Sequence, residues 1–464
     1  MSWIDSGVRD TANALRDGKT SASEVLEDYI AQIERHNPTI NALVVLDFED
    51  ARAQAKRVDQ RRSRGETLGP LAGVPTSIKE AFAMEGTPTT CGFESYIDQL
   101  PTFDAPAVQA LRNADVVIIG KSNVPTSLSG FGCTNPVYGQ TSNPWALDRT
   151  PGGSSGGSAA SIASSFSALD LASDLSGSIR IPSSWCGVAG FRPSPGQLSK
   201  RGHLPWPLTT VLEPPESVVG LIAATADDLA YAWNSVLSGT SGIQRSSQEL
   251  PLDSHRSVLR IGYWLQSGAL WVDHEVTTAL LGVIDTLSRL GHCLESYQPQ
   301  FDEAVVIELA RRLTDSEITF GLNEEVWKSW DHEAFNTRDY LRDLNTIEGL
   351  RQSIDSELKR FDFIVCPAAP IVAPTATDIG NVNKVISVGD SSIELRSISD
   401  WSLVTSIFQL PSVTMPIGLS KDKLPIGMQV VSRNGMDLHV LAAAQMIELA
   451  IESIGRPILL GHKI

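Results

Sequence analysis

The chain has 464 residues, of which 42% are hydrophobic and 20% are charged, an ordinary composition for a globular protein. Its net charge of −17 argues against nucleic acid and anionic membrane surfaces as partners. The start of the chain lacks the apolar segment of a signal peptide, and no apolar run is long enough to span a membrane. We therefore expect a cytoplasmic protein.

Residues 1–65 predict an N-terminal helical region. Thr20, Ser21 and Ser23 are the candidate caps of its second helix. The elements expected here are helices at 6–17, 20–35 and 48–64, with a strand at 41–46. Beyond this region, the apolar run 74–78 predicts a strand that ends on Lys79. A lysine at a strand end is commonly a solvated cap, but the Gly- and Pro-rich flanks here also allow an inward-facing side chain.

The middle of the chain alternates short apolar runs with helical patterns. The predicted strands are 116–119, 168–172, 188–191 and 218–223, and the predicted helices are 105–113, 158–165 and 226–237. The long segment 121–151 carries no regular pattern, which is typical of a functional loop. A polar, Ser-rich surface connection is expected at 239–257.

The same alternation continues to the end of the chain. The predicted strands are 260–264, 363–366, 412–416 and 428–432, the predicted helices are 275–290, 401–410 and 438–451, and residues 301–360 are mostly helical. This alternation indicates an α/β fold. We expect residues 240–360 to be a variable, mostly helical region that shapes a substrate pocket.

The segment Pro151–Arg180 carries two clusters rich in glycine and serine, 152–157 and 176–178. Glycine lets other groups approach the backbone closely, and serine supplies hydroxyl groups. Nucleophilic acyl transfer needs an attacking oxygen and N–H donors for the oxyanion that forms. The segment therefore predicts a nucleophile site rather than a flexible linker, since apolar runs flank both clusters.

Three other chemistries can be compared. Residues 152–156 fit the G-x-S-x-G nucleophile elbow, but no strand precedes them, and only His439 and His462 lie late enough to complete a Ser-His-Asp triad. The five cysteines show no CxxC spacing, which favours reduced thiols over disulfides or a zinc site. A buried lysine can instead activate a serine, with Lys79 as the candidate base and Lys121 as the second choice.

The motifs of this chain resemble those of the amidase signature family of serine hydrolases, most closely its fatty acid amide hydrolase-like members. The resemblance covers most of the chain and is weakest between about 240 and 360. The motifs that carry it are 73–75 with Lys79, 121–125, 135–141, 143–145, 151–157, 174, 177–182, 186–187, 190–193, 367–370, 410–412, 416–418 and 424–429.

This resemblance implies a three-layer α/β/α sandwich with a large, mixed, twisted sheet, formed as one domain over residues 1–464. It also implies hydrolysis of a carboxylic amide without a metal or cofactor. Ser178 would be the nucleophile, Ser154 would relay the proton after a cis Gly153–Ser154 bond, and Lys79 would be the base. The roles implied for other residues are oxyanion donors at the backbone of Leu175, Ser176, Gly177 and Ser178, and a supporting shell of Ser155, Asp174 and Arg180.

The chain departs from the family pattern at Ser176, where glycine is usual, and at Trp185, where phenylalanine is common. A positive φ at Ser176 would strain the backbone. The long Gly-Tyr-Tyr motif of the transamidase subunit is not visible, which disfavours that role. Leu128, Phe131, Trp185, Trp206 and the tryptophans at 264, 271, 327 and 330 suggest an apolar or aromatic acyl group, unless they belong to the core.

The expected partner is therefore a small-molecule amide substrate. The sequence also allows a homodimer. The alternatives to an amidase are an acyltransferase or amide-forming enzyme, an ester-cleaving member, and a non-catalytic assembly subunit with the same fold.

Overall fold

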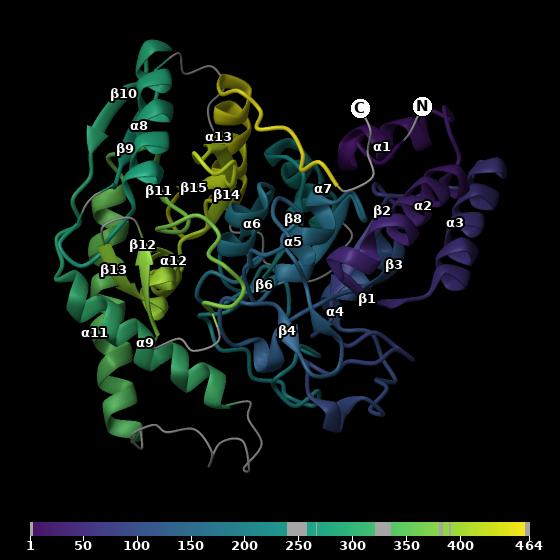
Figure 1. Ribbon diagram of the computed structural model, residues 1–464, viewed down its shortest axis with the longest axis horizontal. Helices are drawn as coiled ribbons and strands as arrows, with labels where there is room; N and C mark the ends of the chain where they lie inside the picture. Colours follow the sequence, from purple (N-terminus) through teal and green to yellow (C-terminus); the bar gives the residue numbers. More distant parts are fainter. Residues whose placement is uncertain are drawn as a thin grey trace.

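A mixed sheet of 11 strands forms the centre of the computed structural model, which describes residues 3–238, 258–265, 267–320, 336–379, 384–388 and 391–459 (Figure 1). The strands lie in the order β1-β3-β2-β6-β8-β7-β14-β15-β11-β9-β10. Their bounds are β1 Leu43–Leu46, β2 Pro75–Lys79, β3 Val117–Ser122, β6 Leu169–Asp174, β7 Ala189–Arg192, β8 Val218–Ala223, β9 Arg260–Tyr263, β10 Cys293–Ser296, β11 Phe363–Pro367, β14 Ser412–Leu419 and β15 Pro425–Val431. Two small hairpins lie outside it: β4 Thr134–Asn135 with β5 Gly139–Gln140, and β12 Val385–Val388 with β13 Ser391–Glu394.

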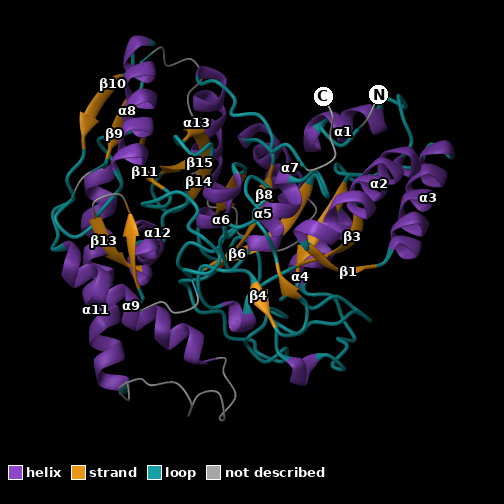
Figure 2. Ribbon diagram, in the orientation of Figure 1, coloured by secondary structure: helices purple, strands orange, loops and turns teal. Residues whose placement is uncertain are grey.

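Helices cover both faces of the sheet, which makes the fold a three-layer α/β/α sandwich (Figure 2). Helices α5 and α6 pack together on one face, and α7, α8 and α13 pack on the other. The helix bounds are α1 Gly7–Arg16, α2 Ala22–Ile40, α3 Phe48–Ser63, α4 Pro106–Asn113, α5 Gly156–Ala163, α6 Arg180–Cys186, α7 Ala226–Ser238, α8 His274–Arg289, α9 Glu303–Phe320, α11 Thr337–Leu358, α12 Asp400–Ile407 and α13 Asp437–Ala450. The fold class expected from the sequence is confirmed.

Strand β2 lies between β3 and β6 and runs parallel to both. The register pairs Thr76 with Leu169 and Ile78 with Leu171. Because parallel strands end at the same edge of a sheet, Lys79 at the end of β2 and Asp174 at the end of β6 lie close to each other. This edge is where the residues of the expected site come together.

Most predicted elements agree with the structure to within a few residues, but some do not. Helix α2 ends at Ile40 rather than at residue 35, and its cap is Ser21, which accepts from the Glu24 amide while Glu24 bonds back to the Ser21 amide. Helix α6, strand β10 and the β12–β13 hairpin were not predicted. The connection expected at 239–257 lies outside the described residues.

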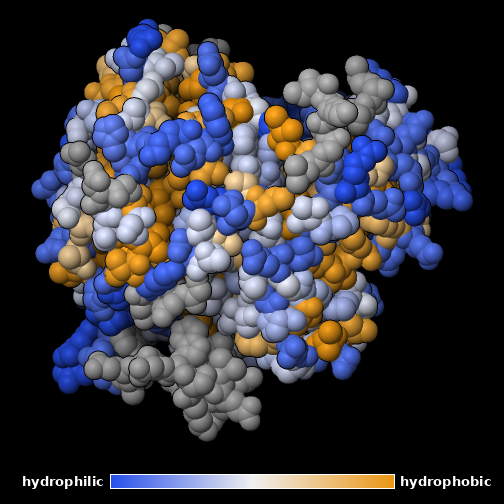
Figure 3. Space-filling model, viewed as in Figure 1, coloured by the Kyte–Doolittle hydropathy of each residue, from blue (hydrophilic) through white to orange (hydrophobic). Residues whose placement is uncertain are grey.

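The N-terminal helices each bury one face: α2 and α3 pack against each other and against β2 and β3, and α1 packs against α7. Helix α3 buries Ala51, Gln54, Ala55 and Val58, while its charged side faces solvent. Figure 3 shows hydrophilic residues predominating over α1, α2 and α3 at the right of the view. Among the described helices, none combines the length and apolar character needed to cross a bilayer.

Candidate active site

Lys79 points into the protein from the end of β2, and its side chain is fully buried. Its Nζ lies 2.7 Å from Ser154 Oγ, 2.9 Å from Ser173 Oγ and 3.5 Å from the Ser173 carbonyl oxygen. Burial lowers the pKa of Lys79 to about 8, although Cys91, Asp174 and Asp170 nearby pull it upward. At pH 7 about one tenth of this amine is therefore neutral and can accept a proton, a far larger share than at the ordinary lysine pKa of 10.5.

Ser154 sits in the turn that leads into helix α5, and the Gly153–Ser154 peptide bond is cis. Helix α5 consists of small residues and is entirely buried. At Gly157, a Cβ atom would lie 2.3 Å from the Asn123 backbone nitrogen, so only glycine fits. The glycines after Ser154 thus let this turn pack directly against the backbone that follows β3.

Ser178 is partly exposed and lines a cavity of about 390 Å³ together with Ser154. The Ser155 amide donates to the Ser178 carbonyl oxygen at 3.1 Å, which ties the two serine-bearing turns together. The Ser155 hydroxyl donates to the Ser173 carbonyl oxygen at 3.3 Å. The structure therefore places Ser154 and Ser178 on one cavity, with Lys79 buried in contact with Ser154.

The turn from Leu175 to Ser178 lines the same cavity. Gly177 has a φ of 119°, whereas Ser176 does not take a positive φ. The strain considered at Ser176 is therefore absent, because only the following residue needs glycine. The Gly177 amide donates to Asp174 Oδ1 at 2.9 Å. An oxyanion that accepted from this N–H would therefore share it with the Asp174 carboxylate.

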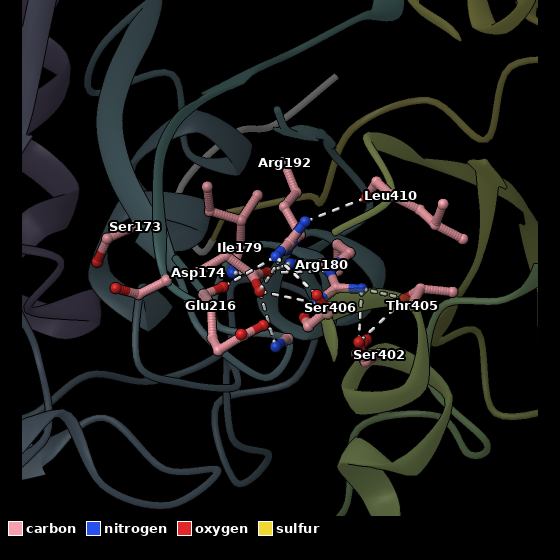
Figure 4. Close-up of polar contacts among 12 residues, drawn as sticks. Ser173, Asp174, Ile179, Arg180, Arg192, Glu216, Ser402, Thr405, Ser406 and Leu410 are labelled. Atoms are coloured by element: carbon pink, nitrogen blue, oxygen red, sulfur yellow. Dashed lines mark hydrogen bonds and ion pairs between the residues drawn. The ribbon is translucent and has the colours of Figure 1, made fainter. Parts of the chain in front are cut away.

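A buried ion network holds this turn in place (Figure 4). Asp174 accepts from the Ile179 amide at 2.9 Å and from Arg180 Nη2 at 2.7 Å. Arg180 also donates to the Ser402 carbonyl oxygen and to Thr405. Burial alone would raise the pKa of Asp174, but the Arg180 charge and these hydrogen bonds hold it well below its usual range. Asp174 therefore stays ionised and anchors the turn.

The chain matches a known protein family over most of its length. A family model described as Amidase matches residues 24–317 and 307–441. The chain belongs to the amidase family. A glutamyl-tRNA(Gln) amidotransferase subunit of Alkaliphilus metalliredigens is 27% identical over 471 residues, which cover 92% of this chain and 93% of the relative.

Solved structures of amidase family members have the same fold. A chain from a vestigial protein complex, reported to reveal the evolutionary origins of an s-triazine catabolic enzyme, is 28% identical. It superposes with a TM-score of 0.81 over 97% of this chain and 100% of its own. A 6-aminohexanoate cyclic dimer hydrolase complexed with substrate is 25% identical, with a TM-score of 0.77 over 98% of this chain and 99% of its own.

The apolar residues singled out for substrate binding in this amidase family member fall into two groups. Leu128, Phe131 and Trp206 line the cavity. Trp185 does not: it is fully buried in a separate apolar cluster, where its Nε1 donates to the Ile371 carbonyl oxygen at 2.8 Å. Trp264 is also a core residue. The other tryptophans are Trp271, which packs partly buried against the cluster of Trp185, and positions 327 and 330, which lie outside the described residues.

Two polar residues at the site were missed by the sequence analysis. Ser173, the residue before Asp174, contacts Lys79 through its hydroxyl. His203 Nε2 lies 2.8 Å from that same hydroxyl. Helix α9 was expected only as part of a pocket-shaping region, and Arg311, Thr314 and Ile318 of this helix line the cavity. No local pattern marks His203 as a site residue, because the loop that carries it is placed by tertiary packing.

None of the five cysteines, all of which the structure describes, lines the cavity that Ser154 and Ser178 line. Cys91, Cys133, Cys186 and Cys366 are free and buried, and Cys293 is free and exposed. Burial raises the pKa of Cys133 to about 11 and that of Cys91 well above its usual value, so these two thiols are protonated near neutral pH. Among the described residues, no three His, Cys, Asp or Glu side chains are grouped so that they could hold a metal ion.

Replacement of Arg180 by leucine is expected to destabilise the protein by about 3–5 kcal/mol, since it removes the closer of the two guanidinium groups that pair with the buried Asp174 carboxylate and leaves only Arg192 at 3.7 Å. Urea unfolding followed by circular dichroism measures this change. The matched control is Arg52→Leu, which breaks an exposed bidentate pair with Glu27 and should cost less than about 1 kcal/mol. An equal loss in the two variants would contradict the anchoring role of Asp174.

Proposed function

We propose that the protein is a serine amidase that hydrolyses a carboxylic amide to a carboxylate plus ammonia or an amine. The observation that carries this proposal is the contact between the buried Lys79 amine and Ser154, beside the cavity that Ser178 lines. A buried lysine with a lowered pKa can serve as the base that a serine nucleophile requires. Membership of the amidase family supports the same conclusion.

In acylation, the Ser178 hydroxyl oxygen attacks the amide carbonyl carbon and its proton passes to Ser154. At the same time, Ser154 gives its own proton to neutral Lys79. The carbonyl oxygen becomes an oxyanion, which the backbone N–H groups of the 175–178 turn stabilise. Lys79 then returns the proton through Ser154 to the leaving nitrogen, the C–N bond breaks, and an ester on Ser178 remains.

In deacylation, a water molecule takes the place of the amine. It loses a proton to Lys79 through Ser154 and attacks the ester carbon. The same N–H groups stabilise the second oxyanion. When this intermediate collapses, the bond between the acyl carbon and the Ser178 oxygen breaks, Lys79 returns the proton through Ser154 to Ser178, and the released acid loses its remaining proton to water as the carboxylate. An alcohol leaving group depends less on proton donation than an amine leaving group does. Esters of the same acids should therefore also be cleaved.

We further propose that the acyl group is apolar or aromatic. Leu128, Phe131 and Ile181 line the cavity beside the serines, and Ile318 and Leu403 line it from α9 and α12. Apolar side chains of this kind bind an apolar acyl group by removing its surface from water. In this proposal α9 belongs to the variable region that shapes the substrate pocket.

A glutamine-cleaving component of an amidotransferase is the second candidate, because relatives such as that of Alkaliphilus metalliredigens carry the amidotransferase name. Arg311, Asp315 and Arg396 also line the cavity and offer charged partners to the polar end groups of glutamine, so the rates with the two substrates decide between the functions. Initial rates with glutamine and with an aryl amide separate the two functions. Added hydroxylamine separates hydrolysis from acyl transfer, since a transferase converts most of the acyl-enzyme to the hydroxamate.

The rate of acylation is expected to rise with pH through a midpoint of about 8, the pKa of Lys79. Below this pKa the amine carries a proton and cannot accept another, so kcat/KM should fall about tenfold for each pH unit of acidification. Measurement of kcat/KM between about pH 6 and 10 tests this. A midpoint at the ordinary lysine value of 10.5 would contradict the lowering of the Lys79 pKa by burial.

The first test of the proposed function is covalent labelling with a serine-reactive fluorophosphonate, followed by intact mass and peptide mapping. A single adduct on Ser178 supports the proposal. An adduct on Ser154 or on a cysteine, or no adduct at all, would refute the assignment and favour a non-catalytic role for the fold.

A further inference from the structure

A continuous chain of buried side chains runs from His203 to Ser154. His203 Nε2 lies 2.8 Å from Ser173 Oγ, Ser173 Oγ lies 2.9 Å from Lys79 Nζ, and Lys79 Nζ lies 2.7 Å from Ser154 Oγ. All four residues are at least nine-tenths buried. These are hydrogen-bond distances, so in each contact one of the two residues donates its hydrogen and the other accepts it.

The His203 imidazole is held in place by its own surroundings. The His203 amide donates to the Lys200 carbonyl oxygen at 3.1 Å, and the next amide, of Leu204, donates to Ala81 at 2.9 Å. The imidazole ring meets the Phe82 ring edge to face at a centroid distance of 4.5 Å. The loop that carries His203 is therefore fixed to the residues that follow Lys79 in sequence.

We propose that His203 is a positioning residue that accepts a hydrogen bond from the Ser173 hydroxyl. This hydrogen bond sets the direction of every donor and acceptor from His203 to Ser154. The inference rests on the proposed function. When the Ser173 hydroxyl donates to His203 Nε2, its oxygen can only accept from Lys79. The lone pair of neutral Lys79 is then free for the Ser154 proton. Without an acceptor at His203, the Ser173 hydroxyl would donate to Lys79 and occupy the lone pair that the relay needs.

The same arrangement also suits the protonated state of Lys79. An ammonium group has three N–H donors. Three acceptors surround Nζ: Ser154 Oγ, Ser173 Oγ and the Ser173 carbonyl oxygen. Lys79 can therefore take up the proton during acylation without a change of partners, provided that the Ser173 hydroxyl still points toward His203.

The surroundings keep His203 neutral, as an acceptor must be. Burial and the nearby charges of Lys79 and Lys200 hold the pKa of His203 well below its ordinary value. The groups that act on Lys79 are the thiols of Cys91 and Cys133 and the carboxyls of Asp170 and Asp174. Of these carboxyls, Asp170 has a pKa raised by burial to about 6, below the midpoint expected for Lys79.

The test compares the rate of fluorophosphonate labelling across pH in the wild-type protein, His203→Phe, His203→Gln and Ser173→Ala. Phenylalanine keeps an aromatic ring but cannot accept a hydrogen bond, whereas the glutamine amide oxygen can. His203→Phe should lower the plateau rate about 10- to 100-fold, as expected for a lost buried hydrogen bond. The midpoint of the rise in its labelling rate with pH should move to lower pH by about one unit, since the Lys79 ammonium loses an acceptor. Ser173→Ala should shift the limb likewise, and His203→Gln should recover most of the wild-type rate and limb.

The matched control is Phe82→Leu, which removes the ring contact to His203 but leaves the hydrogen bond in place. It should keep the midpoint of the wild-type limb. A purely structural role for His203 would instead lower the rate at every pH in His203→Phe with the midpoint unmoved, and this result would overturn the proposal. Poor folding of His203→Phe would leave the decision to the His203→Gln and Ser173→Ala profiles.

Nitrogen-15 NMR of the histidines gives a measurement that does not depend on catalysis, with the His203 signals assigned by their loss in His203→Gln. The expected state near pH 7.5 is a neutral imidazole with its proton on Nδ1. A proton on Nε2 would overturn the proposal even in an active enzyme. Failure of the proposed function is distinguishable, because wild-type protein would then give no Ser178 adduct whichever nitrogen carries the proton.

Discussion

Ser178→Ala is expected to lower kcat for amide hydrolysis by at least about 10⁴-fold, the loss typical of removing the nucleophile of a serine hydrolase. The alanine variant keeps the backbone N–H groups of the turn but has no oxygen that could form the acyl-enzyme. Because Ser178 is partly exposed, loss of its hydroxyl leaves no buried group unpaired. The melting temperature and the Kd for a substrate should therefore stay close to the wild-type values.

The control for this prediction is Cys133→Ala, which removes a buried thiol close to Gly156 in the turn after Ser154. This variant should retain activity, since the thiol is protonated near neutral pH and takes no part in the relay. Unchanged turnover in Ser178→Ala would rule out the proposed acyl-enzyme. Activity lost in Cys133→Ala but kept in Ser178→Ala would identify a thiol nucleophile instead.

Lys79→Met is expected to have the second large effect, a loss of about 10⁴-fold in both kcat and the rate of fluorophosphonate labelling. Methionine fills much of the lysine volume but offers no lone pair for the Ser154 proton. The residual rate should no longer show a limb near pH 8, since the group that titrates there is gone. Labelling rates across pH and steady-state kinetics measure both effects.

Lys121→Met is the matched control, because Lys121 is the other fully buried lysine on this part of the sheet, with a pKa also lowered by burial to about 8. Its Nζ donates to the Pro88 carbonyl oxygen and to Thr89, so its loss should cost stability but not serine reactivity. If labelling fell equally in the two variants, Lys79 would not be the specific base.

Local features of the site could be predicted because they depend on neighbouring residues. Glycines in the 152–157 cluster are required where the backbone packs closely, as at Gly157, and a glycine-rich run shows this directly in the sequence. Lys79 stands at the end of the run 74–78, which was predicted as a strand and forms β2 in the structure. The positions of Lys79, Ser154 and Ser178 were therefore available from the motifs, with their roles implied by resemblance to a family.

Contacts between distant segments could not be predicted in this way. The sequence does not decide the orientation of Lys79, since a strand-end lysine can face solvent or the interior. The structure turns it inward because Ser154 and Ser173, 75 and 94 positions away, provide its hydrogen bonds. His203 had no sequence signal, as its partner Ser173 is 30 positions away and reaches it only through the packing of a loop.

The aromatic residues show the same division. Leu128 and Phe131 line the cavity, whereas Trp185 lies in an apolar cluster that also contains Ile371 and Leu395. Hydrophobic character predicts that a side chain leaves water, not whether it faces a cavity or the core. By itself the sequence determined the α/β alternation and the glycine turns, because these depend on local periodicity and backbone geometry, and its motifs implied the candidate triad by resemblance to a family. Only the tertiary structure decided which side chains meet, because strand order and loop packing bring together residues that are far apart in the chain.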